Sequence, residues 1–320
     1  MLTLSAVIPT YNRAHLILDA LSSIMNQTRV PDEILVIDDG STDETEQVVA
    51  DWIRAQPDSV SVVYKRQENA GGNVARNLGV SLATGDLIAF LDSDDLWLPT
   101  KTEKQIALFD DPKVGAAYCG LRETVIGSDA APEIPTRSYP SGDLLAKLLV
   151  SDVTAPTSTY MIRRSIFDDA GLFDETLTAR QDWDMWIRIA KHTQIAAVPE
   201  ALVDLRSHDG PRTVSDPTRE LAAYRAILAK YEDLRAELPL AKRQAALASY
   251  HRRAGRVHYH HMGKPLAAIG HYLRAIITWP FAPDSYAALI GVFLTASLRR
   301  KLHQGWNRVF GRTFLSIKNH

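Results

Sequence analysis

Hydrophobic residues in the first 120 positions gather in short runs that alternate with stretches of helical periodicity. Between the runs, apolar side chains recur every three or four residues, as at Ile17, Leu21 and Ile24, which is the spacing of a helix with one buried face. The runs themselves predict five strands, at residues 4–8, 33–37, 60–64, 86–91 and 114–118. Strands separated by helices predict an α/β fold in which a mostly parallel, Rossmann-like sheet is flanked by helices.

One of these helices is expected directly after Gly71-Gly72, and its pattern makes a specific prediction. Val74, Leu78 and Leu82 recur every four residues, so they are expected to form its buried stripe. Arg76 lies two residues from Val74, about 200° of helical rotation, and therefore off that stripe. Arg76 is expected to point either toward solvent or toward a ligand beside the sheet.

Acidic residues directly follow two of the predicted strands. Asp38-Asp39-Gly40-Ser41 comes after the second strand, and Asp92-Ser93-Asp94-Asp95 comes after the fourth. In parallel sheets of this kind, ligands bind beyond the carboxyl ends of the strands. Two carboxylates one residue apart can share a divalent cation with the oxygens of a bound diphosphate. Aspartates also stabilise turns and helix starts, so the spacing alone leaves a purely structural role open.

The pattern changes twice further along the chain. Residues 120–150 are weakly patterned, with Gly and Pro scattered between Gly127 and Gly142, and are expected to form a loop excursion. After Pro217 the sequence becomes rich in alanine and in other helix-forming residues. We therefore predict an α/β domain over residues 1–215 and an all-helical region over residues 216–320.

Five strings of residues, in this order, closely resemble glycosyltransferase family 2. They are Val7–Asn12, Val36–Asp43, Ala75–Gly79, Phe90–Asp95 and Gln181–Asp184, and the resemblance covers roughly residues 3–210. It implies the GT-A fold and a Mg²⁺- or Mn²⁺-dependent, inverting transfer of a sugar from a nucleoside-diphosphate sugar, with UDP as the expected nucleotide. The implied acceptor is a hydroxyl of a glycan or a lipid-linked acceptor, as in cell-surface polysaccharide synthesis.

The resemblance also assigns roles to individual residues. It implies that the donor is bound by Thr10, Tyr11, Asp39, Arg76, Asp92 and Ser93. Within this set Asp39 would face the nucleoside and Asp92 the ribose, while Asp94 would hold the metal. His208, in a basic segment that closes the region of resemblance, is a candidate further metal ligand. A histidine in a surface loop is the alternative for this position.

The general base is expected in the last of the five strings. Asp182 then lies in the first turn of a helix, where the helix dipole favours an ionised carboxylate, and it is the preferred base. Asp184 is its rival. The family usually has Glu where this chain has Gln181, which leaves the hydrogen-bonded surroundings of Asp182 open. The helix start is predicted by an apolar face formed by Trp183, Trp186, Ile187 and Ala190.

Charge is divided unevenly along the chain. Residues 1–250 hold 25 Lys and Arg against 37 Asp and Glu, a net charge of −12, whereas residues 251–320 hold 11 against 1, a net charge of +10. The uncharged run at 286–298 is too short to span a bilayer. Basic residues together with Trp306, Phe310 and Phe314 suit a helix that lies on anionic lipid, with a buried helix as the alternative. No nucleic-acid-binding motif accompanies the positive charge.

The cellular location follows from two further features. Cys119 is the single cysteine, which excludes an intramolecular disulfide and suits a reducing compartment. The first residues form an apolar strand without a preceding basic region or a cleavage site, so export by a signal peptide is not expected. We expect a cytoplasmic protein, either free or attached peripherally to the inner face of the membrane.

Two other classes of protein share parts of this pattern. A sugar nucleotidyltransferase would use a similar sheet and metal, but it would carry a Gly-rich basic loop where this chain has Pro9–Asn12. An inactive module that recruits partners through its helical region would not need Asp92, Asp94 and Asp182. Turnover of a sugar nucleotide separates these classes from a glycosyltransferase.

Overall fold

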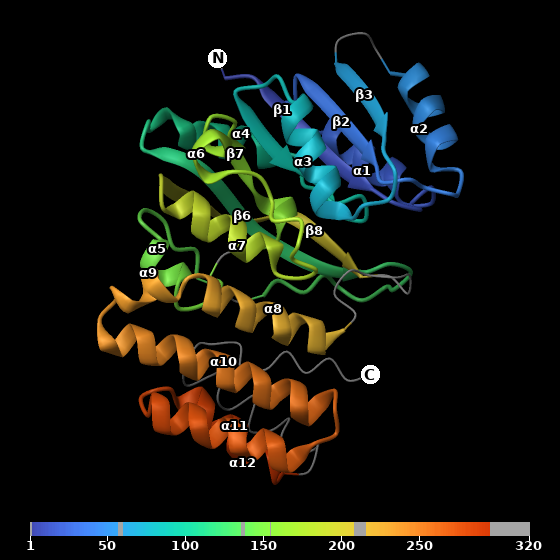
Figure 1. Ribbon diagram of the computed structural model, residues 1–320. Coiled ribbons are helices and arrows are strands. Elements are labelled where there is room, and N and C mark those ends of the chain that lie inside the picture. The colour runs from blue at the N-terminus through green and yellow to red at the C-terminus, as the bar shows by residue number, and fades with distance from the viewer. Residues whose placement is uncertain (1, 57–59, 136–137, 154, 208–215, 295–320) are drawn as a thin grey trace. The chain divides into compact units, whose positions relative to one another are not determined.

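The computed structural model describes residues 2–56, 60–135, 138–153, 155–207 and 216–294 (Figure 1). The chain divides into two compact units. The first comprises Met1–Leu145, Val153–Leu177 and Gln181–Gly210, and the second comprises Ala146–Asp152, Thr178–Arg180 and Pro211–His320. The second unit therefore takes two short pieces from within the span of the first.

The first unit is built on a sheet whose described strands follow the order β3-β2-β1-β4-β7-β6-β8-β5. β1 is parallel to β2 and β4, β2 is parallel to β3, and β6 is parallel to β8, while the other neighbouring pairs are antiparallel. The strands are β1 (Leu4–Thr10), β2 (Glu33–Asp38), β3 (Ser61–Arg66), β4 (Leu87–Phe90), β5 (Leu96–Trp97), β6 (Val114–Val125), β7 (Met161–Arg163) and β8 (Gln194–Ser207). The predicted α/β fold is confirmed, and β1, β2 and β4 are buried along their whole length.

Helices lie over the sheet of the first unit. In Figure 1, α3 crosses in front of β1 and β2, whereas α1 lies behind them. The helices of this unit are α1 (Ile17–Met25), α2 (Thr45–Arg54), α3 (Gly72–Leu82), α4 (Lys101–Ile106), α6 (Ile166–Ala170) and α7 (Gln181–Ala190), with the 3-10 turns η1 (Ala107–Asp110) and η2 (Thr157–Thr159). A short helix, α5 (Leu145–Leu148), crosses from the first unit into the second.

The second unit contains the helices of the C-terminal region. They are α8 (Pro217–Lys230), α9 (Glu232–Ala236), α10 (Leu240–His260), α11 (Pro265–Thr278) and α12 (Pro283–Val292). α11 packs on α10 through the buried residues Ala268, Tyr272 and Ala275. The approach is close at Gly255 of α10, where an added Cβ would lie 2.5 Å from the ring of Tyr272.

The prediction for the buried face of α3 is wrong. Val74 and Leu78 are only half-buried, and Leu82 is 38% exposed. α3 approaches the sheet through small residues instead, since a Cβ added at Gly79 would lie 2.3 Å from a valine of β1. Arg76, expected outside the buried stripe, is itself buried on this helix.

Two asparagines on α3 explain why polar residues are buried there. Asn73 Nδ2 donates to the carbonyls of Asp174 and Leu177, at 3.0 Å each. Asn77 Nδ2 donates to the carbonyl of Phe173 at 2.9 Å, and its Oδ1 accepts from the N–H of the same residue at 2.8 Å. Buried polar groups are tolerated when their hydrogen bonds are satisfied. A prediction that assigns only apolar stripes to the buried side of a helix therefore misses this face of α3.

The weakly patterned region after residue 120 is partly strand. β6 continues to Val125 and pairs in parallel with β8 up to Ser207, so the loop predicted here begins later. Polar and charged side chains pair across these strands: Arg122 Nη2 donates to Asp204 Oδ2 at 2.8 Å, and Thr124 Oγ1 donates to Asp204 Oδ1 at 2.7 Å. Such polar cross-strand pairs stabilise a sheet without producing a hydrophobic pattern.

Lys101 is a cation buried in the first unit. Its side chain has no exposed surface, and Nζ donates to Gln105 Oε1 at 2.8 Å while lying 4.1 Å from the centre of the Trp97 ring. Burial disfavours the charged ammonium and lowers the pKa of Lys101 to about 8. At neutral pH the folded protein therefore carries the cost of a desolvated charge.

The free energy of unfolding is expected to rise through this lysine between about pH 8 and its ordinary pKa of 10.5. In that window the unfolded chain holds a proton at Lys101 that the folded chain has released, so a higher pH favours the folded state. The expected gain is about 3 kcal/mol. Denaturant unfolding measures it as the difference between the wild type and Lys101→Met, which cancels other titrating groups.

Lys104→Met is the matched control for this measurement. Lys104 lies in the same helix, but its side chain is 38% exposed and pairs with Glu200. Its difference from the wild type is expected to stay nearly constant over the same pH range. An equally flat difference for Lys101→Met would contradict the argument from burial.

Candidate functional site

Two polar residues end β1 and β2 side by side. Thr10 pairs with Asp38 across the parallel strands, and the N–H of Asp39 donates to the carbonyl of Thr10 at 2.9 Å. Thr10 is 3% exposed, and its Oγ1 has no hydrogen-bond partner among the residues that the structure describes. A buried hydroxyl without a partner at the end of a strand is a group that a bound ligand can satisfy.

Of the two adjacent aspartates after β2, Asp38 has a structural role. It is fully buried, its Oδ1 accepts from the N–H of Ser41 at 2.8 Å, and its Oδ2 accepts from the hydroxyl of Tyr64. Burial, followed by this bond to Asp38, raises the pKa of Tyr64. Because both carboxylate oxygens are bound inside the protein, Asp38 shapes the turn.

Asp39 organises the loop that leads into α3. Its Oδ1 accepts from Gln67 Nε2 at 2.7 Å and from the N–H of Ala70 at 2.8 Å, and its Oδ2 accepts from the N–H of Gly71 at 2.8 Å. A carboxylate offers about four acceptor positions. These three bonds hold Asp39 in place and leave room on Oδ2 for one further donor.

Arg76 reaches from α3 to the first aspartate after β4. Its Nη2 donates to Asp92 Oδ1 at 2.6 Å, and its guanidinium carbon lies 5.9 Å from the centre of the Phe173 ring. Arg76 is 8% exposed, and its Nε is a second buried polar atom without a partner in the described part of the chain. Arg76 does point to the edge of the sheet, but from a buried face of the helix.

Asp95, to which the sequence assigned no role, supports the turn after β4. Its Oδ2 accepts from Ser158 Oγ at 2.6 Å and its Oδ1 accepts from the N–H of Arg206 at 3.2 Å. Ser158 Oγ in turn accepts from the N–H of Asp92 at 3.1 Å. Burial, reinforced by the charges of Asp92 and Asp94, raises the pKa of Asp95 well above its ordinary value. Asp95 therefore anchors the turn from inside.

Exposure alternates along this turn. Ser93 and Asp95 are buried, whereas Asp92 and Asp94 are partly exposed on its outer side. Arg206 Nε fixes the backbone between them by donating to the carbonyl of Asp94 at 2.7 Å. The two outer carboxylates suit Mg²⁺ or Mn²⁺, which takes one or two protein carboxylates together with phosphate oxygens. Among the described residues, no three His, Cys, Asp or Glu side chains form a group that could hold a metal by themselves.

α7 begins at Gln181, as predicted from its apolar face. Asp182 is partly exposed in the first turn, and its Oδ1 accepts from the N–H of Trp183 at 2.8 Å. The rival residue Asp184 is fully buried, and its Oδ2 accepts from Arg188 Nε at 3.0 Å. The two candidate bases therefore differ in environment, since only Asp182 combines some exposure with a helix N-terminus.

Two residues assigned from the sequence remain to be placed. Tyr11 is 44% exposed next to Thr10, and the following Asn12 joins the two strand-end loops because its Oδ1 accepts from the N–H of Thr42 at 2.7 Å. His208 lies outside the described residues. The structure brings together, at the carboxyl ends of β1, β2 and β4, the residues Thr10, Asp39, Arg76, Asp92, Ser93 and Asp94, while Asp182 stands on a separate helix.

Comparison with known proteins places the chain among glycosyltransferases. Residues 5–171, just over half of the chain, match the model of glycosyl transferase family 2. An uncharacterized glycosyltransferase of Rickettsia typhi is 31% identical over 229 residues, covering 70% of this chain and 69% of that protein. The Escherichia coli UDP-Glc:alpha-D-GlcNAc-diphosphoundecaprenol beta-1,3-glucosyltransferase WfgD is 28% identical over 198 residues, covering 61% of this chain and 72% of that protein. The chain spans only 30 to 35% of the length of similar proteins from three other Rickettsia species.

Two solved structures share the fold. TarS of S. aureus, residues 1–349 in complex with UDP-GlcNAc, superposes with a TM-score of 0.61 at 22% identity, over 96% of this chain and 87% of that one. The mannosyltransferase PcManGT from Pyrobaculum calidifontis, in complex with GDP-Man and Mn²⁺, superposes with a TM-score of 0.58 at 18% identity, over 98% and 84%. At these identities the likeness concerns the fold, which is the GT-A arrangement expected from the sequence.

Proposed function

Because the chain belongs to glycosyltransferase family 2, we propose that it is an inverting enzyme that moves a sugar from a nucleoside-diphosphate sugar to a hydroxyl acceptor. The observation that carries this proposal is the meeting of Thr10, Asp39, Arg76 and Asp92 at one edge of parallel strands. Two buried polar atoms there, Thr10 Oγ1 and Arg76 Nε, lack partners among the described residues. We assign the chemistry to residues 1–215.

A UDP-sugar is the proposed donor, and a glycan or lipid-linked sugar is the proposed acceptor. The similar E. coli enzyme is named for UDP-Glc and for a diphosphoundecaprenol-linked sugar, and TarS is described with UDP-GlcNAc. These names support a role in cell-surface polysaccharide synthesis.

On the donor side, the proposed roles follow the contacts of each residue. Asp39 keeps one acceptor position for an N–H or O–H group of the nucleoside, beside Thr10 and Tyr11. Asp92, fixed by Arg76, faces the ribose, and Ser93, which is buried next to it in the same turn, is a further proposed donor contact. Arg76 supplies a fixed positive charge near the diphosphate. This arrangement orients the donor before any bond is broken.

Asp94 is the proposed metal-holding residue, with His208 as a further ligand from outside the described residues. The fold neighbour PcManGT is described with Mn²⁺. When bound, Mg²⁺ or Mn²⁺ would neutralise the charge that develops on the departing nucleoside diphosphate. Asp95 and Arg206 hold the turn that presents Asp94.

On the acceptor side, Asp182 is the proposed general base. Its carboxylate lies in the first turn of α7 and accepts a backbone hydrogen bond from the N–H of Trp183. A weakly basic carboxylate suffices when the sugar carbon develops oxocarbenium character before the acceptor loses its proton. Attack by the acceptor oxygen on the face opposite the leaving group then inverts the anomeric centre.

A donor screen tests this proposal. UDP, GDP, dTDP and their sugars are added with Mn²⁺ to the full chain, and the midpoint of thermal unfolding is measured, since a ligand that binds the folded state raises it. We expect one nucleotide class to raise the midpoint and its sugar nucleotide to be turned over. Absence of both, with capture of partners by the helical region, would favour an inactive module. Synthesis of a sugar nucleotide from a sugar phosphate and a nucleoside triphosphate would favour a nucleotidyltransferase.

The C-terminal region is proposed to hold the enzyme on an anionic membrane surface on the cytoplasmic side. Residues 240–294 contain seven Lys and Arg against Asp284, a net charge of +6. Leu266, Leu273 and Ile277 lie about 150° around α11 from the stripe that packs on α10, and they are 83%, 45% and 81% exposed. Lys264 and Arg274, which lie close to these residues in sequence, are exposed as well, and such a combination of apolar and basic side chains suits an interfacial surface. The basic tail that follows, with Trp306, lies outside the described residues, and no helix among those described has the length and hydrophobicity to cross a bilayer.

Leu266→Ser/Ile277→Ser is expected to weaken binding to phosphatidylglycerol-containing vesicles about tenfold, because two apolar side chains lose their transfer into the lipid. Vesicle flotation of the full chain measures the bound fraction. Leu240→Ser is the matched control, since Leu240 is 64% exposed but lies at the start of α10. Equal binding of the double variant and the wild type would remove this surface from the proposal.

A further inference from the structure

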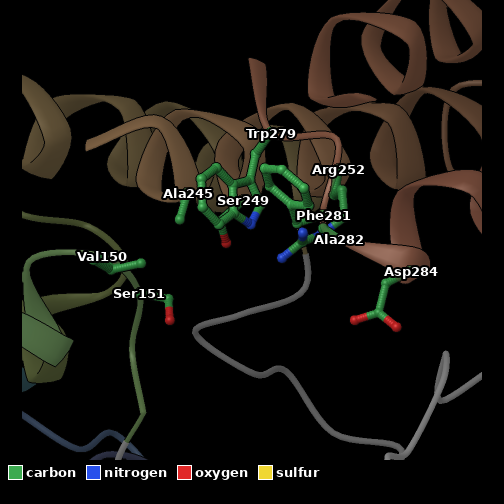
Figure 2. A pocket seen from close by; sticks show the side chains of 9 residues that line it. All are labelled: Val150, Ser151, Ala245, Ser249, Arg252, Trp279, Phe281, Ala282 and Asp284. Carbon is green, nitrogen blue, oxygen red and sulfur yellow. The ribbon is translucent and has the colours of Figure 1, made fainter. Parts of the chain in front are cut away.

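The second unit contains a pocket that is separate from the site described above (Figure 2). It has a volume of about 270 Å³ and lies where the end of α11 and the start of α12 meet the middle of α10. Its lining includes Ser151, Ser249, Arg252, Trp279, Phe281 and Asp284, all from this unit. Small-molecule sites usually measure about 300–1,000 Å³, so this pocket has room for one small ring rather than for a nucleotide sugar.

Two aromatic rings form one wall of the pocket. Trp279 and Phe281 meet edge to face, with ring centres 5.2 Å apart at 71°. Phe281 is 77% exposed although it is a large apolar residue, and Figure 2 shows both rings beside Ser249. An aromatic wall that is open to solvent offers contact to the C–H face of a ring that is otherwise polar.

The polar groups of the pocket are of both signs. Arg252 supplies guanidinium donors, and Asp284 supplies acceptors, with Oδ1 buried and without a partner among the residues described. Ser285, next to it, has a fully buried Oγ that likewise lacks one. A buried carboxylate oxygen without a donor is costly, and a ligand hydroxyl would satisfy it. The lining carries one positive and one negative side chain, a balance that favours neither an anion nor a cation, so a neutral ligand with several hydroxyls fits best.

We propose that this pocket binds one neutral monosaccharide unit of a glycan, with the sugar ring against Trp279 and Phe281 and its hydroxyls on Asp284 and Arg252. The pocket goes beyond the proposed function, because it neither contains nor requires the donor-binding residues. A sugar site on the helical region would keep a glycan bound to the enzyme while other sugar units of the same glycan leave and re-enter the site of sugar transfer.

Saturation-transfer NMR on the full chain tests the proposal, with the methyl glycosides of glucose, galactose, mannose and N-acetylglucosamine as probes. At least one glycoside is expected to receive saturation from the protein. Trp279→Ala and Asp284→Asn are each expected to weaken its binding about tenfold, by removing the ring contact or the charged acceptor. Phe293→Ala is the matched control, since Phe293 is an exposed aromatic residue of the same unit that does not line the pocket.

The outcomes separate this pocket from the donor site. Saturating UDP with Mn²⁺ is expected to leave the glycoside signal unchanged, and competition by UDP would place the sugar in the donor site and overturn the proposal. Lack of signal from every glycoside, or equal binding by the wild type, Trp279→Ala and Asp284→Asn, would also overturn it. Binding of inorganic phosphate in place of the glycosides would identify an anion site instead. The unfolding midpoint of each variant shows that it is folded.

Discussion

Replacing Asp182 with asparagine is expected to lower kcat for sugar transfer about a thousandfold, within the range that a general base contributes. Asparagine keeps the size of the side chain, and its Oδ1 can still accept from the N–H of Trp183. It cannot take a proton from the acceptor hydroxyl. The Kd of the donor is expected to hardly change, because the proposed donor-binding residues lie at the strand ends and on α3, and none of them lies on α7. Initial rates at saturating donor, with calorimetry of donor binding, measure both effects.

Asp184→Asn is the control that separates the two candidate bases. Asp184 is fully buried and paired with Arg188, whose Nη1 also donates to the carbonyl of Ala170 at 2.5 Å. Breaking a buried pair by removing one charge typically costs about 3–5 kcal/mol of stability. We therefore expect a lower unfolding midpoint with kcat retained per folded molecule. A stable Asp184→Asn without activity, beside an active Asp182→Asn, would reverse the assignment.

The sheet edge could be predicted because its determinants are local in sequence. β1, β2 and β4 are buried along their whole length, so each appears as a mostly apolar run that is followed closely by polar residues. Gly40, which follows β2, has φ of +80°, and an added Cβ would lie only 2.9 Å from the nitrogen of Asn69, so the turn there requires glycine. The start of α7 was predictable for the same reason, since an apolar face identifies a helix even when the elements that pack against it are unknown.

The support of the site could not be predicted, because it comes from distant parts of the chain. Asp95 is bonded to Ser158 and Arg206, which are 63 and 111 residues away. Nothing in the Asp92-Ser93-Asp94-Asp95 string says which carboxylate turns inward. Periodicity describes only the spacing of side chains along the sequence. Which aspartate points into the protein depends on hydrogen-bond donors that folding brings close to the turn.

The error at α3 has a related physical cause. Periodicity assumes that a buried stripe is apolar, and Val74, Leu78 and Leu82 met that criterion. Asn77 is buried in their place because the backbone at Phe173 satisfies both ends of its amide. The polar face of α3 is thus turned inward, and this is also what brings Arg76 to Asp92. Local rules failed here on the helix that carries a proposed site residue, where a buried polar face has a chemical use.

The second large effect is expected from Asp94→Asn. The variant should lower kcat on the order of a hundredfold, because a metal contributes several kcal/mol to stabilising charge on a phosphate leaving group. It should also lose the additional thermal stabilisation that we expect Mn²⁺ to give to the nucleoside diphosphate complex, while the smaller shift expected from the nucleotide alone remains. The midpoint of unfolding, measured with UDP in the presence and absence of Mn²⁺, separates these two parts.

Asp95→Asn and Asp110→Asn are the controls for the expected loss of the Mn²⁺-dependent shift in Asp94→Asn. Asp95 accepts hydrogen bonds from Ser158 and Arg206 with its two oxygens, and the amide nitrogen of asparagine cannot accept, so Asp95→Asn is expected to lower the unfolding midpoint of the protein without ligand. Asp110 is exposed, and its replacement should change neither quantity. Asp94 is partly exposed, and its replacement is expected to leave the ligand-free midpoint close to that of the wild type. A Mn²⁺-dependent shift that survives in Asp94→Asn would mean that the cation is held by other groups. Only the loss of that shift, with the ligand-free midpoint unchanged, assigns the metal to the outer carboxylate of the turn.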